Sequence, residues 1–120
     1  MKSLGKKVWI IPDCELPPEG EGVLKGHESV VIVNDTNKTA KIKVKLFFTD
    51  KPVYDKIVWE VKPQSVRCFR MNNLNDMCGY DVEKETQYAM KLVSDRKIVV
   101  QYGRLDNRQL NLAYYTTMAY

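Results

Sequence analysis

The single histidine of the chain lies in the tripeptide Gly26-His27-Glu28, where an irregular segment meets an apolar one. An imidazole beside a carboxylate offers the hydrogen-bonding groups that a small polar ligand needs. The two side chains are not expected to act on the same substrate atom, because adjacent residues of a strand point to opposite faces. The simpler alternative is that His27 is a solvated residue at the start of a strand, and the residues alone favour it.

Other residue types that carry chemistry lack the spacing that the chemistry requires. No serine lies in a G-x-S-x-G sequence, so a hydrolase nucleophile is not indicated. The cysteines Cys14, Cys68 and Cys78 are dispersed and form no C-x-x-C pair, which argues against a disulfide framework and a zinc site. The segment Gly20-Glu21-Gly22 carries acidic residues that would repel a phosphate. We therefore predict no enzyme activity, no cofactor and no metal.

The densest polar cluster is Arg104-Leu105-Asp106-Asn107-Arg108-Gln109, which lies between two apolar segments. Arginine forks together with an aspartate can bind a carboxylate or sugar hydroxyls, or hold neighbouring subunits together. The alternative is a salt-bridged turn at the surface, where such pairs contribute only about 0–1 kcal/mol.

A second group of charges alternates with aliphatic residues along one segment. Lys41, Lys43 and Lys45 alternate with Ile42, Val44 and Leu46, as in a strand with one face in water and one in a core. The lysines could contact nucleic acid, although a solvated face is the commoner explanation. The net charge of +4 permits nucleic-acid binding without indicating it.

The elements that must position these residues are strands. Residues 29–33 and 41–48 are apolar or alternating, and the Asn- and Asp-rich residues 34–37 between them predict a β-hairpin. Further strands are expected at residues 56–62, 64–71, 87–93, 98–100 and 110–120, with a polar loop at 72–85 and a turn at 94–96. Alternation places Trp59, Tyr88 and Leu92 on the core side of their strands. About eight short strands predict an all-β fold, an antiparallel β-sandwich or barrel.

The remaining segment, residues 12–26, holds three of the five prolines and three of the six glycines. We expect it to be a long loop without regular pairing, and long loops in compact domains are usually functional or disordered. The length of 120 residues and the apolar content of 44% predict one folded domain over residues 1–120. The apolar run at residues 8–11 is too short for a signal peptide, and no segment is long enough to span a membrane, so a soluble, cytoplasmic protein is expected.

Taken in order, many short motifs resemble the soluble sensory rhodopsin transducer family, the cytoplasmic proteins paired with cyanobacterial-type sensory rhodopsins. The motifs that carry the resemblance are Trp9-Ile10-Ile11-Pro12, Pro17-Pro18-Glu19-Gly20, Gly26-His27-Glu28, Asn34, Asp50, Asn72-Asn73-Leu74-Asn75-Asp76, Ile98-Val99-Val100-Gln101, Arg104-Leu105-Asp106-Asn107-Arg108-Gln109 and Thr117-Met118-Ala119-Tyr120. Each motif alone is weak evidence. Together the motifs extend over nearly the whole chain, and their order and spacing make the resemblance specific.

This resemblance implies a jelly-roll-like β-sandwich that assembles as a homotetramer and has no catalytic activity. It implies binding to the cytoplasmic face of a membrane photoreceptor, a sensory rhodopsin, and it leaves room for a small-molecule ligand such as a sugar and for DNA. The family's polar and aromatic motif residues fall on Trp9, Pro12, His27, Glu28, Asp76, Arg104, Asp106, Arg108 and Gln109.

Two functional hypotheses follow. The first is a non-enzymatic signalling or ligand-sensing module whose rim, built from residues 12–26 and 104–109, binds a partner or a small ligand. The alternative is a DNA-binding regulatory protein in which Lys41, Lys43 and Lys45 repeat around an oligomer. Four copies would carry a charge of about +16, four times the single-chain value, which strengthens attraction to phosphates.

Overall fold

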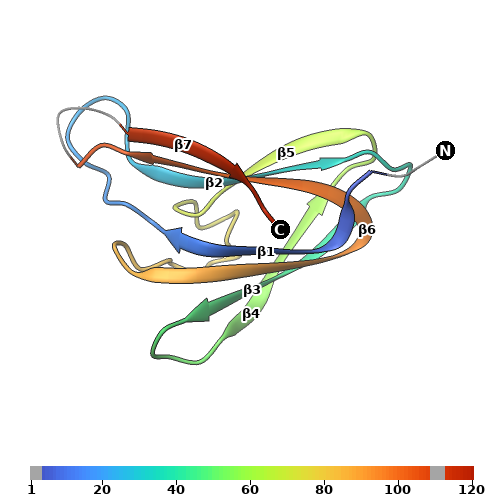
Figure 1. Ribbon diagram of the computed structural model, residues 1–120, viewed down its shortest axis with the longest axis horizontal. Coiled ribbons are helices and arrows are strands. Elements are labelled where there is room, and N and C mark those ends of the chain that lie inside the picture. Colours follow the sequence, from blue (N-terminus) through green and yellow to red (C-terminus); the bar gives the residue numbers. More distant parts are fainter. Residues whose placement is uncertain (1–3, 109–112) are drawn as a thin grey trace.

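The described part of the chain is a curled, all-β structure of seven strands (Figure 1). A computed structural model describes residues 4–108 and 113–120. The strands are β1 (Lys6–Glu15), β2 (His27–Asn34), β3 (Ala40–Phe48), β4 (Tyr54–Val61), β5 (Ser65–Arg70), β6 (Gln87–Asp106) and β7 (Ala113–Met118). All strand pairings are antiparallel, so the predicted all-β, antiparallel, sandwich-like class is confirmed.

Two four-stranded sheets share the long strand β6. In the first sheet the order is β4-β3-β6-β1, with the first half of β6 between β3 and β1. In the second sheet the order is β5-β2-β6-β7, with the last part of β6 between β2 and β7. Figure 1 shows β6 bending between the sheets, so that their inner faces enclose the core.

The continuity of β6 corrects one prediction. Residues 94–96 do not form a turn between two strands, because β6 runs without a break for 20 residues. Ser94 is buried opposite Ile42 in the first sheet, and Val99 lies opposite Val33 in the second. The polar residues 94–96 mark the passage from one sheet to the other, and residues 4–108 and 113–120 form seven strands where about eight were expected.

The predicted hairpin of residues 29–33 and 41–48 is wrong. Strands β2 and β3 follow each other in the chain, but β2 pairs with β5 and β6 while β3 pairs with β4 and β6. The turn chemistry is present, since the Thr36 N–H donates to Asn34 Oδ1 at 3.0 Å. Asn34 Nδ2 donates to the carbonyls of Lys38 and Val61 at 2.8 and 3.0 Å, which ties this connection to the end of β4. The connection therefore crosses between sheets.

The core lies between the inner faces of the two sheets. Trp59 of β4 stacks on Phe69 of β5 with ring centroids 4.1 Å apart, so the expected core role of Trp59 is confirmed. Ile42 and Leu92 are also buried, as their alternation predicts, and so is Val100. At the outer edge of β1, Ile10 exchanges two backbone hydrogen bonds with Tyr120, which links the residues after β7 to the first sheet.

Residues 12–26 are a loop only in part, so the prediction of a long unpaired segment is wrong for residues 12–15. Strand β1 continues through Pro12 to Glu15, with a register shift between Ile11 and Cys14. Proline is tolerated at such an irregularity of an outer strand, where its missing N–H interrupts little of the ladder. The unpaired loop comprises residues 17–26.

Candidate functional site

One end of the sandwich gathers the ends of four strands. Strand β1 ends there, β2 and β7 begin there, and β6 both begins and ends there, at the left of Figure 1. We call this region the polar end and define it by Glu15, His27, Arg104, Asp106 and Arg108. It brings residues 12–26 and 104–108 together, the two segments from which the sequence predicts a rim.

Beneath the polar end lies a buried carboxylate. Glu28 of β2 is fully buried and accepts three hydrogen bonds. The Tyr88 hydroxyl donates to Oε1 at 2.6 Å, the Glu15 N–H donates to Oε2 at 2.9 Å, and the Tyr102 hydroxyl also donates to Oε2. Tyr88 and Tyr102 come from the two halves of β6, so this one side chain connects both sheets.

Burial sets the acid–base properties of this cluster. It raises the pKa of Glu28, although hydrogen bonds from Tyr102, Tyr88 and the Glu15 N–H act in the opposite direction. Burial and the nearby Glu28 carboxylate raise the pKa values of Tyr88, Tyr102 and the Cys14 thiol. These three groups therefore stay protonated at neutral pH, and the two hydroxyls remain hydrogen-bond donors to Glu28.

Arg104 lies between this cluster and the solvent. Its Nε donates to the Tyr102 hydroxyl oxygen at 3.1 Å and its Nη2 donates to the Asp13 carbonyl at 3.4 Å. The guanidinium carbon is 5.8 Å from the ring centroid of Tyr102 and 5.4 Å from that of Tyr115, distances at which cation–π attraction operates. The half-buried arginine thus joins the buried cluster to the surface of the polar end.

A surface salt-bridge network surrounds Arg108. The Arg108 Nε donates to Asp106 Oδ2 at 2.9 Å, and its Nη1 is 3.6 Å from Glu15 and 3.5 Å from Glu85. The hydrogen bond from Arg108 lowers the pKa of Asp106. Exposed pairs of this kind stabilise a fold little, so this network contributes little to the stability of the polar end.

The loop of residues 17–26 is fixed against the turn after β6. Asn107 is buried, and its Nδ2 donates to the Leu24 carbonyl. A Cβ atom on Gly26 would overlap the Pro18 carbonyl oxygen, and one on Gly20 would overlap the Asn107 side chain. Gly20 therefore allows the loop backbone to approach Asn107 closely, and Gly26 allows it to approach Pro18.

His27 points away from Glu28. Its Nδ1 lies 2.8 Å from the Lys25 carbonyl and its side chain is half-buried on the outer face of the second sheet. The prediction that His27 and Glu28 do not form a dyad is confirmed. A ligand contact through His27 stays a prediction.

Comparisons with known proteins identify the family. A sequence profile described as the Anabaena sensory rhodopsin transducer matches residues 4–120. The chain belongs to this family. It is similar to the crystal structure of Thermotoga maritima 1070, with a TM-score of 0.86, 28% identity, and coverage of 97% of this chain and 94% of the other. It is also similar to the structure of the Anabaena sensory rhodopsin transducer, with a TM-score of 0.71, 26% identity, and coverage of 85% and 84%. A comparison with curated proteins gave no match.

Three residues carried over from the family motifs have structural contacts away from the salt-bridge network. Trp9 is buried, and its Nε1 donates to the Lys6 and Ile98 carbonyls at 2.8 and 3.1 Å. Asp76 accepts from the Arg70 N–H at 2.9 Å and so organises the loop after β5. Pro12 lines a small hollow beside Phe48. Gln109 lies outside the described residues.

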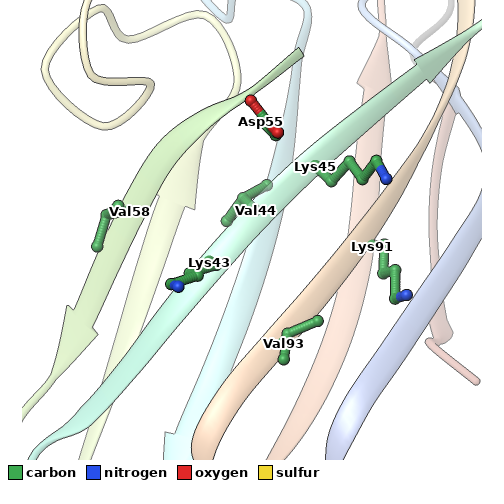
Figure 2. Close-up of a pocket in the computed structure, with 7 residues that line it drawn as sticks. All are labelled: Lys43, Val44, Lys45, Asp55, Val58, Lys91 and Val93. Atoms are coloured by element: carbon green, nitrogen blue, oxygen red, sulfur yellow. The ribbon is translucent and has the colours of Figure 1, made fainter. Parts of the chain in front are cut away.

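Lys41, Lys43 and Lys45 lie on the outer face of the first sheet, as the alternation predicts. Lys43 and Lys45 line a groove of about 440 Å³ between β4, β3 and β6 (Figure 2). The other residues that line it are Val44, Asp55, Val58, Lys91 and Val93. Carboxylates interrupt this face, since Glu60 lies opposite Lys41 and the Asp95 carboxylate accepts from the Lys41 N–H at 2.8 Å.

The outer face of the second sheet differs in character. Strand alternation and pairing place on it His27, Ser29, Val31 and Val33 of β2, Val66, Cys68 and Arg70 of β5, Val99, Gln101, Gly103 and Leu105 of β6, and Tyr114, Thr116 and Met118 of β7. Arg70 is the only residue of this set with a permanent charge. We call this surface the uncharged face.

Sequence reasoning missed the partners of Glu28 and the uncharged face. Tyr88 was expected to face the core, but nothing local connects it with Tyr102 or with Glu28. The continuous apolar run of residues 30–33 was a signal for the uncharged face, because strands covered on both sides lack alternation. Within the described residues, no three His, Cys, Asp or Glu side chains gather as metal ligands would, and no helix is long and apolar enough to cross a membrane.

Proposed function

We propose that this protein is a non-enzymatic, cytoplasmic signal transducer that binds the cytoplasmic face of a membrane photoreceptor, a sensory rhodopsin, through its polar end. Family membership supports the signalling role. The single observation that carries the binding surface is the exposed cluster of Arg108 with Asp106, Glu15 and Glu85. These groups add little to folding, and each can exchange its present partner for one on another protein.

The same end offers a site for a small ligand such as a sugar. Arg104 and Arg108 present guanidinium donors, and Asp106 presents acceptor oxygens for hydroxyl groups. A ligand that binds Arg104 would be linked through it to the buried hydrogen-bonded cluster of Tyr102 and Glu28. Because Tyr88 and Tyr102 lie in different sheets, binding of a ligand at the polar end would reach residues of both sheets through these hydrogen bonds.

We further propose that the uncharged face joins copies of the chain in a homotetramer. Val33 and Val66 are directly paired and are 41% and 64% exposed, and Met118 is 55% exposed. The centres of protein–protein interfaces are depleted of charge and enriched in Met and Tyr. Because Arg70 is the only permanent charge on this face, association would bury few unpaired charges.

The test of partner binding uses a sensory rhodopsin reconstituted in nanodiscs and titrated with the full chain. Arg108→Gln should weaken binding about tenfold, since it removes one charge-assisted contact. Arg96→Gln, on β6 at the passage between sheets, serves as the control and should bind as the unmodified chain does. Equal affinity for the unmodified chain and Arg108→Gln would remove the polar end as the docking surface.

Direct DNA binding is the alternative, and the exposed lysines of β3 support it. It requires an affinity that falls steeply with salt and weakens in the triple variant Lys41→Gln, Lys43→Gln, Lys45→Gln. Retention on DNA that does not depend on salt or on these lysines would exclude it.

A further inference from the structure

The groove on the outer face of the first sheet carries three lysines in adjacent strand positions. Lys45 of β3 and Lys91 of β6 are direct partners in the antiparallel pairing, and Lys43 lies two residues along β3 on the same face. Like charges directly opposite each other destabilise a sheet. Among the described residues, none of the three lysines takes part in a salt bridge.

The groove also offers apolar surface beside these charges. Val58 and Val93 are the direct partners of Lys43 on its two sides, and they are 53% and 40% exposed. Figure 2 shows the three lysines and both valines on the neighbouring strands β4, β3 and β6, and all five residues line the groove. Its volume of about 440 Å³ lies in the range of small-molecule sites, which is roughly 300–1,000 Å³.

The charge of the groove defines the class of ligand. Three lysines and one carboxylate, that of Asp55, give a local charge of +2 (three minus one). Lysine ammonium groups bind phosphate as point charges, without the bidentate geometry of arginine. A phosphate monoester, close to a dianion at neutral pH, would neutralise this charge.

We propose that this groove binds a small organic phosphate. Lys45 and Lys91 hold the phosphate group, whose charge relieves their mutual repulsion, and the organic part lies on Val58 and Val93 beside the stem of Lys43. The site is on a different surface from the polar end and is independent of receptor binding there. Lipid headgroups carry the same phosphate chemistry, so the experiment separates the two sources.

The experiment titrates the full chain with phenyl phosphate and, separately, with inorganic phosphate at low ionic strength in a calorimeter. Lys45→Gln and Lys91→Gln should each weaken phenyl phosphate binding about tenfold. Lys97→Gln, an exposed lysine of β6 outside the groove, is the matched control and should leave the affinity unchanged. Val93→Thr should weaken phenyl phosphate more than inorganic phosphate, because it alters only the surface under the organic part.

A second measurement separates lost binding from lost folding. Without phosphate, Lys91→Gln should melt at the same temperature as the unmodified chain or higher, since it removes one of two opposed charges. With phenyl phosphate, the unmodified chain should gain stability that the variant does not. The proposal is overturned if phenyl phosphate does not bind, if Lys91→Gln binds it unchanged, or if only phosphatidic acid vesicles or DNA bind to the lysines.

Discussion

The two sheets of this protein place their charges on opposite sides. The first sheet has lysines on its outer face, including Lys43, Lys45 and Lys91, and none of its described charged residues is buried on the core-facing side. The second sheet buries the carboxylate of Glu28 on its inner face, and among its described residues only Arg70 places a permanent charge on the outer face. Both sheets contain part of β6. The difference in where the charges lie is therefore a property of the two sheets, and it does not separate one segment of the chain from another.

This contrast separates the surfaces by what can cover them. A lysine-bearing face remains solvated until an anion neutralises it. An uncharged face with exposed valines loses little hydration free energy when a second protein surface covers it. The buried carboxylate of the second sheet is tolerated because it accepts three hydrogen bonds. This opposite placement of charges fits the three proposed roles. The uncharged face would join copies of the chain, the groove of the first sheet would bind an anion, and the polar end would bind a partner.

The largest expected effect on stability comes from removing the buried carboxylate of Glu28. Glu28→Ala would leave the hydroxyls of Tyr88 and Tyr102 and the Glu15 N–H without their acceptor in a buried site. We expect the free energy of unfolding to fall by about 3–5 kcal/mol. Glu60→Ala, an exposed carboxylate of the first sheet, should change it by less than about 0.5 kcal/mol. Urea unfolding measures both, and similar losses in the two variants would contradict the contrast.

The uncharged face can be tested by placing a charge on it. Val33→Lys should dissociate the proposed tetramer, because the new ammonium would be buried without a partner at the interface. Val58→Lys places the same charge at a comparably exposed position of the first sheet and should leave the assembly intact. Light scattering coupled to size exclusion reports the mass, and an intact tetramer in Val33→Lys would exclude this face as the interface.

The pH dependence of stability gives a smaller effect. Burial raises the pKa of Glu28 in the folded chain, so the folded state binds this proton more tightly than the unfolded state does. The free energy of unfolding should therefore decrease as the pH rises from the ordinary glutamate value through the raised one. Glu28→Gln cannot ionise and should lack this contribution. Unfolding curves from about pH 4 to about pH 8 would show the difference, and parallel profiles for the two chains would argue against it.

The smallest effect concerns the opposed lysines of the first sheet. Lys45→Glu creates an opposite-charge pair with Lys91 and should raise the free energy of unfolding by about 0.2–1 kcal/mol. Lys41→Glu creates a like-charge pair with Glu60 and should lower it by a similar amount. Both changes should shrink at high salt, which screens exposed charges. Thermal melts at two salt concentrations test the signs, and equal signs would contradict the assigned pairing.

The local pattern of the sequence determined a large part of this structure. Alternation predicted the strands, the solvated side of β3 and the core position of Trp59, because side-chain direction in a strand follows from position alone. It also placed His27 and Glu28 on opposite faces. The two polar segments expected to form a rim do meet, as the contacts of Arg108 with Glu15 and of Asn107 with Leu24 show.

Only the tertiary structure decided which strands pair and which side chains meet. The turn residues at 34–37 are compatible with a hairpin, yet β2 and β3 lie in different sheets, because pairing depends on the register of strands distant in sequence. Glu28 finds its hydrogen-bond donors on Tyr88 and Tyr102, 60 and 74 residues away. Lys91 comes to lie opposite Lys45 through the same long-range pairing. The sequence thus determined the direction of each side chain within its strand, and the bend of β6 between two sheets decided what each of them contacts.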